Sequence, residues 1–437
     1  MSKYIFLILS LSILCSKKAT AQQEIGLHFM DVFQTSKTNP AYISESKILV
    51  GLPQVHFNYF NTGGAFNKLI VDYLNDETSI NAGTSLEKLA ENDNILRGVL
   101  QVETFNLGYR FGKIQLALNH SQKTDIYMNF PQTLAKLFFE GNGQYIGQTI
   151  NLGHDLHLLS YNEFGLSGAI ELSKLTAGVR VKYLTGIANA SVGKNDISLF
   201  TDSDVYQLTL DSDYELNVST LLNSEDLSSF ELRLANFNSQ DLITKNTGYA
   251  IDLGVTYQVN EKLKVAASVV DLGKIDWTEN VDNFSSKGST TYDGFDFSQF
   301  INNDSVSFNS TFDTLQANFD FEETNNSYST NLAAKYYLSA SYQFNEMLRF
   351  GGLFYNESYR GQNFPIFALS AQAKISKMLS VGGVYSGRDG SFFNLGLNFA
   401  LNLGPARLFG TTDNILAVFN PYDNSNVNFR TGLNLLF

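Results

Sequence analysis

The sequence has 437 residues, of which 17% are charged and 13% aromatic, and its formal net charge is −13. The length suits one large domain or two to three ordinary ones, and the charged fraction lies well below the roughly 25% usual in soluble domains. The acidic balance argues against nucleic acid and anionic lipid headgroups as partners, because both select basic surfaces.

The first 21 residues predict a secretory signal peptide. Lys3 gives a short positive start, residues 4–14 (YIFLILSLSIL) form an apolar run, and residues 19–21 (ATA) supply the small residues of a cleavage site. We expect cleavage near Ala21, which would also remove Cys15, the only cysteine, and with it any disulfide chemistry. No later stretch approaches 18 consecutive apolar residues, so a role in a membrane would have to use strands.

Residues 22–46 predict a short N-terminal segment, either periplasmic or a plug inside a barrel. Within it, Pro40 fixes its own φ and pushes Asn39 away from the helical region, so Asn39 and Pro40 predict a turn that leads into the first strand.

From residue 47 to residue 437 the repeated pattern is an apolar side chain at every second position, which is typical of strands. The clearest example is FFNLGLNFALNL, residues 392–403. About fourteen strands are predicted, at 47–60, 103–111, 113–120, 163–172, 175–184, 249–259, 263–272, 335–344, 347–357, 365–375, 378–386, 392–403, 406–419 and 427–437.

The connections between these strands alternate between short and longer. The long ones are predicted at 61–102, 121–162, 185–248 and 273–334, and shorter ones of the same phase at 358–364, 387–391 and 420–426. A secreted soluble β-protein would also show alternating strands. Nothing in such a fold, however, requires every short connection to lie at the same end of the strands. A barrel that spans an outer membrane does, because its periplasmic turns are short and its extracellular loops are longer.

Two of the long loops are strongly acidic, since residues 185–248 and 273–334 hold ten Asp and Glu residues each. The first contains two strand-like pieces, 205–210 and 214–219, which predict a hairpin standing above the membrane. Short helices are predicted at 85–91 and at 131–142, the latter with a proline near its first turn and a glycine past its end.

The last strand, NVNFRTGLNLLF, predicts how the barrel closes. Its apolar side chains would face lipid and the polar ones the lumen, and we expect it to pair with the first strand near 47–60, so that no edge remains. Phe437 would then lie at the periplasmic interface. A terminal aromatic resembles the ending that bacterial barrel-assembly machinery recognises.

The same alternation predicts which charges face the lumen, where they avoid the penalty of several kcal/mol at the lipid face. Small residues lie between them, among them Gly108, Gly178 and Gly254, which leaves room for a pore or for a plug made from residues 22–46. The predicted lumen-facing charges are Arg110, Glu163, Glu171, Arg180, Lys182, Asp252, Lys374 and Arg430.

Few residues suggest chemistry. The sequence GHDLH places His154 and His157 around a carboxylate, but a zinc site would need helical spacing or a third ligand. The DSD triplets at 202–204 and 211–213 carry oxygen ligands of the kind calcium prefers, yet solvated loop charge explains them better. Trp277, the only tryptophan, predicts an anchor in the aromatic girdle. We therefore predict no catalytic residue, no metal site and no cofactor.

Several stretches resemble known outer-membrane barrels. Residues 38–43 (TNPAYI) resemble the Asn-Pro-Ala signature near the start of FadL-type barrels and of type IX secretion-associated barrels of Bacteroidota. Residues 136–153, residues 413–437 and the cleavage region ATAQQ resemble an uncharacterised family of Bacteroidota outer-membrane barrels with a domain of unknown function, close to the PorP/SprF-like membrane proteins. The resemblance covers nearly the whole mature chain and implies a fold and an outer-membrane location.

The sequence therefore predicts an all-β protein, a transmembrane antiparallel up-and-down barrel of about fourteen strands in the outer membrane. We expect a non-enzymatic role in transport or in envelope assembly or secretion. The alternatives are a FadL-like channel for hydrophobic solutes, a surface structural or adhesive protein that acts through the acidic loops, and an envelope enzyme. The expected partners are outer-membrane lipid, the barrel-assembly machinery, and secretion or surface proteins.

Overall fold

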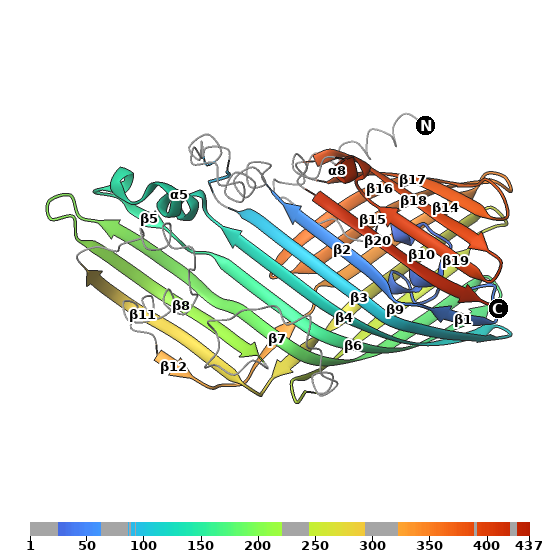
Figure 1. Ribbon diagram of the computed structural model, residues 1–437, viewed down its shortest axis with the longest axis horizontal. Coiled ribbons are helices and arrows are strands. Elements are labelled where there is room, and N and C mark those ends of the chain that lie inside the picture. The colour runs from blue at the N-terminus through green and yellow to red at the C-terminus, as the bar shows by residue number, and fades with distance from the viewer. Residues whose placement is uncertain are drawn as a thin grey trace.

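A computed structural model describes residues 25–62, 86, 89–91, 93–220, 244–292, 322–388, 391–419 and 426–437. The predicted signal peptide, its cleavage site near Ala21, residues 85, 87 and 88 of the predicted helix 85–91, and the central parts of the loops predicted at 61–102, 185–248 and 273–334 lie outside these residues. In the described part of the chain the strands wrap into a closed antiparallel barrel, and they run obliquely along its length (Figure 1).

The barrel wall has 14 strands, as the sequence predicts. Two of them run in two pieces. The first consists of β1 (Ile48–Gly51) and β2 (Gln54–Asn61), and the eighth consists of β13 (Tyr328–Asn331) and β14 (Ala334–Gln343). The others are β3 (Asn94–Phe111), β4 (Ile114–Phe130), β6 (Asp155–Leu172), β7 (Leu175–Thr201), β9 (Thr247–Gln258), β10 (Leu263–Trp277), β15 (Leu348–Tyr359), β16 (Gln362–Lys374), β17 (Leu379–Arg388), β18 (Ser391–Leu403), β19 (Ala406–Thr412) and β20 (Asn426–Leu436).

The last strand pairs with the first and so closes the barrel. Phe429 of β20 lies opposite Phe57 of β2. The carbonyl oxygen of Phe437 accepts hydrogen bonds from the backbone N–H groups of Lys47 and Ile48, both at 2.8 Å. β20 therefore has no free edge, which confirms the predicted closure.

Six tight turns lie together at one end of the barrel, which for a barrel of this kind is the periplasmic end. Gly112 and Gly404, with φ of 61° and 64°, form two of these turns in the left-handed region that glycine adopts without strain. The turns are 112–113, 173–174, 259–262, 344–347, 375–378 and 404–405. The predicted phase of the short connections is thereby confirmed.

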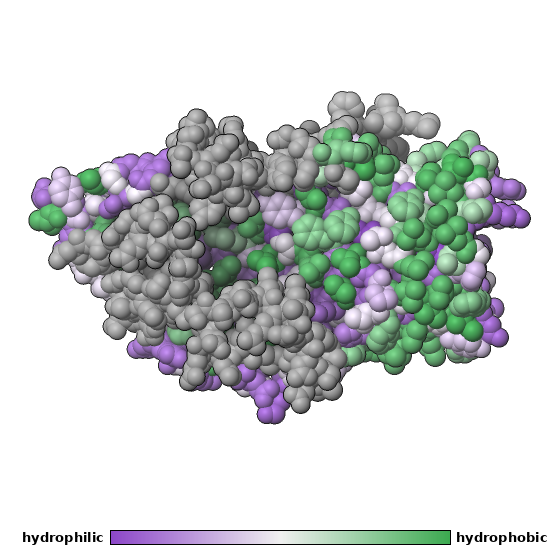
Figure 2. All heavy atoms as spheres, viewed as in Figure 1, coloured by the Kyte–Doolittle hydropathy of each residue, from purple (hydrophilic) through white to green (hydrophobic). Residues whose placement is uncertain are grey.

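The outward-facing side chains toward this end form an apolar belt. Along β6, Leu166 is 57% exposed while the next residue, Ser167, is 9% exposed, and along β18 the values for Leu397 and Asn398 are 47% and 5%. Figure 2 shows apolar side chains gathered over the end of the barrel that carries the tight turns. An apolar belt around a polar interior is the arrangement of a transmembrane barrel.

At the extracellular end the sheet continues far past the belt. β7 alone has 27 residues, whereas about 9–11 suffice to cross the apolar layer. Its outer half pairs with β8 (Leu208–Thr220), and β8 pairs with β11 (Val281–Tyr292). The short strands β5 (Thr149–Asn151) and β12 (Glu322–Thr324) extend this sheet on either side (Figure 1). The predicted loops 185–248 and 273–334 therefore begin as barrel sheet.

The hairpin predicted between residues 205–210 and 214–219 is wrong. Residues 208–210 and all of 214–219 lie in the single strand β8, and its hairpin partner is the outer half of β7. Burial explains the difference, because Leu199, Leu208 and Leu210 are all at most 5% exposed and pack into one apolar cluster. That cluster forms only when the two long strands lie side by side.

Short helices flank the extracellular end. α5 (Gln132–Glu140) confirms the helix predicted at 131–142, with Pro131 at its N-cap and Gly141, at φ 76°, at its C-cap. It is followed by η2 (Gly143–Tyr145). The predicted strand 406–419 is too long, because β19 ends at Thr412 and α8 (Ile415–Phe419) follows. None of the described helices is long and apolar enough to cross a membrane.

Candidate functional site

The N-terminal segment, defined here as residues 25–46, lies inside the barrel. It begins with α2 (Ile25–His28) and continues through η1 (Phe33–Lys37). The carboxylate of Asp413 accepts hydrogen bonds from the N–H groups of Ile25 and Gly26 at 3.2 and 2.6 Å. Further bonds reach several sides of the wall, joining Gln34 to Asn434, Ser36 to Arg180, Thr38 to Ser268 and Phe29 to Arg349. The segment therefore crosses the interior.

Asn39 and Pro40 form a turn that rests directly on the wall. The Asn39 side-chain oxygen accepts a hydrogen bond from the N–H of Ala41 at 2.9 Å. Beneath the turn lie Gly178 of β7 and Gly254 of β9, which are partners across the two strands. A Cβ atom on Gly178 would lie 2.2 Å from the Pro40 carbonyl oxygen, and one on Gly254 would lie 2.1 Å from the Asn39 oxygen. Only glycine leaves space for this turn.

A buried ion pair also attaches the segment to the wall. The Lys37 ammonium contacts the carboxylate of Glu103 on β3, and these side chains are 7% and 0% exposed. Gln54 of β2 donates a second hydrogen bond to Glu103, and Lys37 also donates to Ser121 at 3.2 Å. Both charges are therefore removed from solvent and depend on each other.

Four of the predicted lumen-facing charges meet in one buried network beside the segment. Lys182 lies 2.8 Å from Asp252 and 3.7 Å from Glu163, and Arg180 lies 3.3 Å from Asp252. All four side chains are at most 3% exposed. The network connects β6, β7 and β9 from within the barrel.

Three further members of this network escaped the sequence analysis. Asp271 of β10 contacts Lys182 and lies 3.1 Å from Lys335 and 3.7 Å from Lys123. The alternation could not place Asp271, because the register shifts between Val269 and Leu272 and Asp271 has a φ of 62°. Lys123 lies past the predicted strand end at residue 120, and counting the alternation three residues further would have placed it inward.

The other four predicted lumen-facing charges lie at different depths. Arg430 is 2% exposed and donates to Gln101 at 2.9 Å. Arg110 and Glu171 form an ion pair at 3.3 Å near the periplasmic turns, with side chains 26% and 43% exposed. Lys374 is exposed at the end of β16 and lines a cavity at the periplasmic end.

The end of β15 reaches across the barrel interior. Glu357 of β15 lies 3.0 Å from Arg97 of β3, and both side chains are at most 1% exposed. Arg97 also pairs with Asp125 of β4 at 2.6 Å, and its guanidinium lies over the ring of Tyr359, 4.5 Å from the centroid. β3 and β15 stand on opposite sides of the wall in the strand order, so these contacts bridge the lumen.

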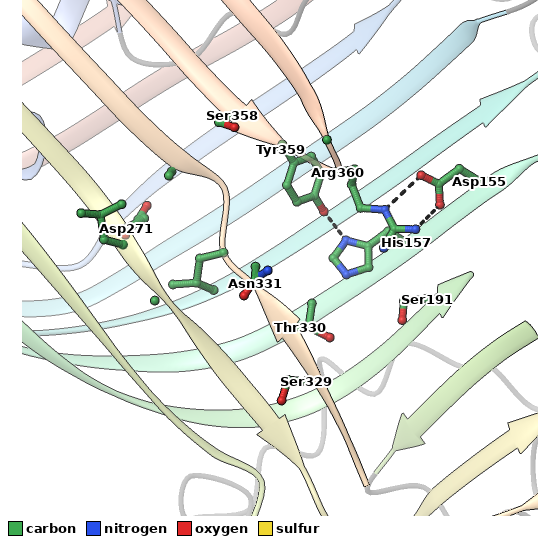
Figure 3. Close-up of a pocket in the computed structure, with 15 residues that line it drawn as sticks. Asp155, His157, Ser191, Asp271, Ser329, Thr330, Asn331, Ser358, Tyr359 and Arg360 are labelled. Atoms are coloured by element: carbon green, nitrogen blue, oxygen red, sulfur yellow. Dashed lines mark hydrogen bonds and ion pairs between the residues drawn. The ribbon is translucent and has the colours of Figure 1, made fainter. Parts of the chain in front are cut away.

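The turn that follows continues this bridge at the extracellular mouth. The connection predicted at 358–364 is shorter than expected, since only residues 360–361 separate β15 from β16. Arg360 donates to the carboxylate of Asp155 on β6 at 3.0 Å and to the carbonyl of Val192 on β7 at 2.6 Å. Tyr359 contacts His157 of β6 through its hydroxyl group (Figure 3). The β15–β16 turn is thus tied to the opposite wall.

Three cavities lined by described residues follow one another along the interior. The outer pocket, of about 560 Å³, lies beside Arg360 at the extracellular end. A cavity of about 40 Å³ lies within the buried charge network, and Asp271 lines both. A third cavity, of about 240 Å³, lies at the periplasmic end beside Met30 and Asp31 of the N-terminal segment. Lys37 lines the middle cavity, so the segment separates the middle cavity from the periplasmic one.

The residues of the GHDLH motif have partners within the fold. His154 contacts the Leu152 carbonyl and the hydroxyl of Tyr214, each at 3.3 Å, and burial lowers the pKa of its imidazole. Asp155 and His157 belong to the bridge at the mouth. In the DSD triplets, Asp202 accepts hydrogen bonds from two backbone N–H groups, and hydrogen bonds from lysines lower the pKa of Asp213.

Trp277 is not a girdle anchor, contrary to the prediction. Its side chain is 0% exposed, and its indole N–H donates to Thr330 at 3.0 Å. The register shift near Val269 exchanges the two faces of β10, so residues beyond it that the alternation assigns outward turn inward. The ring then packs against Gly186 of β7, where an added Cβ would lie 2.5 Å away.

Comparison with known proteins gives one family. Residues 40–413 match the model of a family of unknown function, DUF5723. None of the curated proteins that were compared matches the chain. Among solved structures, the toluene transporter TbuX of Ralstonia pickettii is similar with 10% identity and a TM-score of 0.43, over 93% of this chain and 94% of that one. A FadL homologue of Pseudomonas aeruginosa gives 10% and 0.43, over 94% and 95%.

Proposed function

The chain belongs to the DUF5723 family, whose function is unknown, and we propose that it is a non-enzymatic outer-membrane channel for small solutes that is closed at rest. The observation that carries this proposal is the succession of three cavities along the interior. They lie at the extracellular end, within the charge network and at the periplasmic end. A barrel whose interior only served as a packed core would not need cavities at both ends and between them.

Two barriers interrupt this path. At the extracellular end, Glu357 of β15 and Arg360 of the β15–β16 turn reach the opposite wall. Toward the periplasm the N-terminal segment crosses the lumen and attaches through Lys37. Both barriers depend on side-chain contacts, whereas the wall is held by backbone ladders between neighbouring strands. They can therefore move without unfolding the barrel.

The apolar belt supports a membrane location, and the predicted signal peptide supports export to the outer membrane. The FadL-like alternative predicts an N-terminal plug and an apolar pocket inside the barrel. The N-terminal segment inside the lumen fits the first feature, whereas the outer pocket is lined mostly by polar side chains and does not fit the second. Within this proposal, outer-membrane lipid and the barrel-assembly machinery are the partners, with Phe437 as the residue that the machinery recognises. The proposal also includes a role beside a secretion machine, which co-purification of partner proteins from the outer membrane would test.

A single substitution on the wall tests whether the segment is a barrier. In Gly254→Val, the new side chain would have to displace the Asn39–Pro40 turn, because its Cβ would lie 2.1 Å from the Asn39 oxygen and 2.8 Å from Pro40 Cδ. Gly383→Val is the matched control, since a Cβ on Gly383 has no atom within 4 Å. Conductance across planar lipid bilayers is the measurement.

We expect the wild type and Gly383→Val to stay mostly closed. Gly254→Val should open more often, at the moments when the β15–β16 turn leaves the opposite wall, because the N-terminal segment then no longer blocks the path. Limited proteolysis of the N-terminal segment should rise in the same variant and in no other. Equal conductance of all three proteins, with the segment shown to be displaced in Gly254→Val, would contradict a channel closed by the segment.

A further inference from the structure

The outer pocket has the size and position of a binding site for a small molecule. Its volume of about 560 Å³ lies within the range of roughly 300–1,000 Å³ that such sites occupy. β6, β7, β10, β13 and the β15–β16 turn all contribute to its lining (Figure 3). Resting on the channel function proposed above, we propose that this pocket binds an uncharged solute rich in hydroxyl groups, such as a polyol or a small sugar.

The charged side chains that line the pocket already have partners of opposite charge. Asp155 accepts two hydrogen bonds from the guanidinium of Arg360. Asp271 is paired with Lys182 and with Lys335. An ionic solute that displaced a partner of Asp271, whose side chain is 7% exposed, would leave a buried charge alone, which is costly. Arg360 and Asp155, which are 22% and 18% exposed, are already neutralised by each other. The pocket therefore favours a solute without net charge.

The neutral polar side chains, by contrast, retain hydrogen-bonding capacity. Ser191, Asn331 and Ser358 line the pocket, and their side chains make no hydrogen bond to another described residue. A serine hydroxyl can donate once and accept twice, and an asparagine amide can donate and accept. They come from β7, β13 and β15 and are seen around the pocket in Figure 3.

A hydroxyl group matches this lining because it both donates and accepts. An apolar solute would cover the same side chains without replacing their hydrogen bonds to water, at a cost of about 1–3 kcal/mol for each group left unpaired. Leu272, Leu332 and Ala334 also line the pocket and can contact the C–H surface of a polyol or sugar. Neutral polar groups beside a few apolar ones thus define the class of solute.

The single tryptophan gives a direct measure of binding. Trp277 is fully buried and donates its indole N–H to Thr330, which lines the pocket. Maltose, citrate and laurate are the three probes, representing uncharged hydroxylated, charged and apolar solutes. Titration of the purified full barrel in a non-sugar detergent, followed by tryptophan emission, should give a saturable change with maltose and none with citrate or laurate.

Two variants test whether the named side chains hold the probe. Ser191→Val and Asn331→Leu should each weaken maltose binding about tenfold, the effect of losing one hydrogen bond. Ser289→Val is the control, because Ser289 is exposed on β11 and distant from the pocket. A variant is taken as folded when its tryptophan emission without probe matches that of the wild type.

The outcomes separate this proposal from the proposed channel. Saturation by laurate or citrate, or no response to maltose, overturns the solute class, and so does unchanged maltose affinity in both variants. Conductance that rises in Gly254→Val together with no maltose binding would keep the channel and reject the solute. Maltose binding without conductance in any variant would keep the binding site and reject the channel.

Discussion

Replacing Lys37 by methionine should release the N-terminal segment from the wall. The substitution keeps most of the side-chain volume but leaves Glu103 buried, at 0% exposure, with Gln54 and without its ammonium partner. Breaking a buried ion pair by removing one partner costs about 3–5 kcal/mol. Because the wall ladders are untouched, we expect this cost to appear as local opening of the segment.

Amide hydrogen exchange measures that opening. The N–H groups of Thr38 and Asn39 bond to the Thr35 carbonyl at 3.0 and 3.1 Å, so they are protected while the segment is in place. A loss of 3–5 kcal/mol corresponds to exchange faster by about two to four powers of ten, at 1.36 kcal/mol for each power. Amides of the barrel strands should exchange as in the wild type.

The double variant Lys37→Met with Glu103→Gln supplies the control. Removing both charges leaves no buried carboxylate without a partner, so protection of the Thr38 and Asn39 amides should largely return. The reasoning fails if Lys37→Met leaves their exchange unchanged. It also fails if the double variant exchanges as fast as the single one, because the stranded charge would then not be the cause.

Three further outcomes are expected. Thr330→Val, which removes the acceptor of the Trp277 indole N–H, should lower the free energy of unfolding in urea by about 1 kcal/mol. Acidification below pH about 6.5 should speed amide exchange in β8, because burial lowers the pKa of His154 and the stability that its neutral form contributes is lost as the pH falls toward that lowered pKa. His154→Gln should remove this pH dependence. Phe437→Ala should reduce the amount of folded barrel in the outer membrane but leave refolding in detergent unchanged, if the assembly machinery reads the aromatic side chain.

The alternation of side chains in the sequence is a local property, and it predicts which way most residues of the wall strands face. Where a strand is regular, as from Gly178 to Lys182, the period of two assigns each residue to one face without knowledge of the rest of the fold. One extra residue in a strand is enough to make the prediction of facing wrong for every residue beyond it. The bulge beside Asp271 turns Trp277 inward and brings Asp271 into the charge network, and nothing in the sequence pattern marks the position.

The extracellular parts of the long strands could also not be predicted from the sequence. The predicted strands end where the alternation meets polar residues, because the pattern is set by lipid on one side and lumen on the other. Past the belt, β7 and β8 are held by an apolar cluster that includes Leu199 and Leu208. The same cluster includes Leu137 of α5 and Ile150 of β5, which lie well before β8 in the chain. Contacts between such separated segments depend on the folded arrangement and cannot be read from the pattern of any one segment.

By itself the sequence determined the strand number, the phase of the turns and the closure through the last strand, because these follow from local alternation and chain order. Tertiary structure alone decided what fills the barrel. The wall has space for the Asn39–Pro40 turn because Gly178 and Gly254 become partners across two strands. The bridge from Arg97 to Glu357 exists because strands far apart in the chain face each other across the lumen. Contacts across a lumen depend on the closed shape, so they become visible only once the barrel has formed.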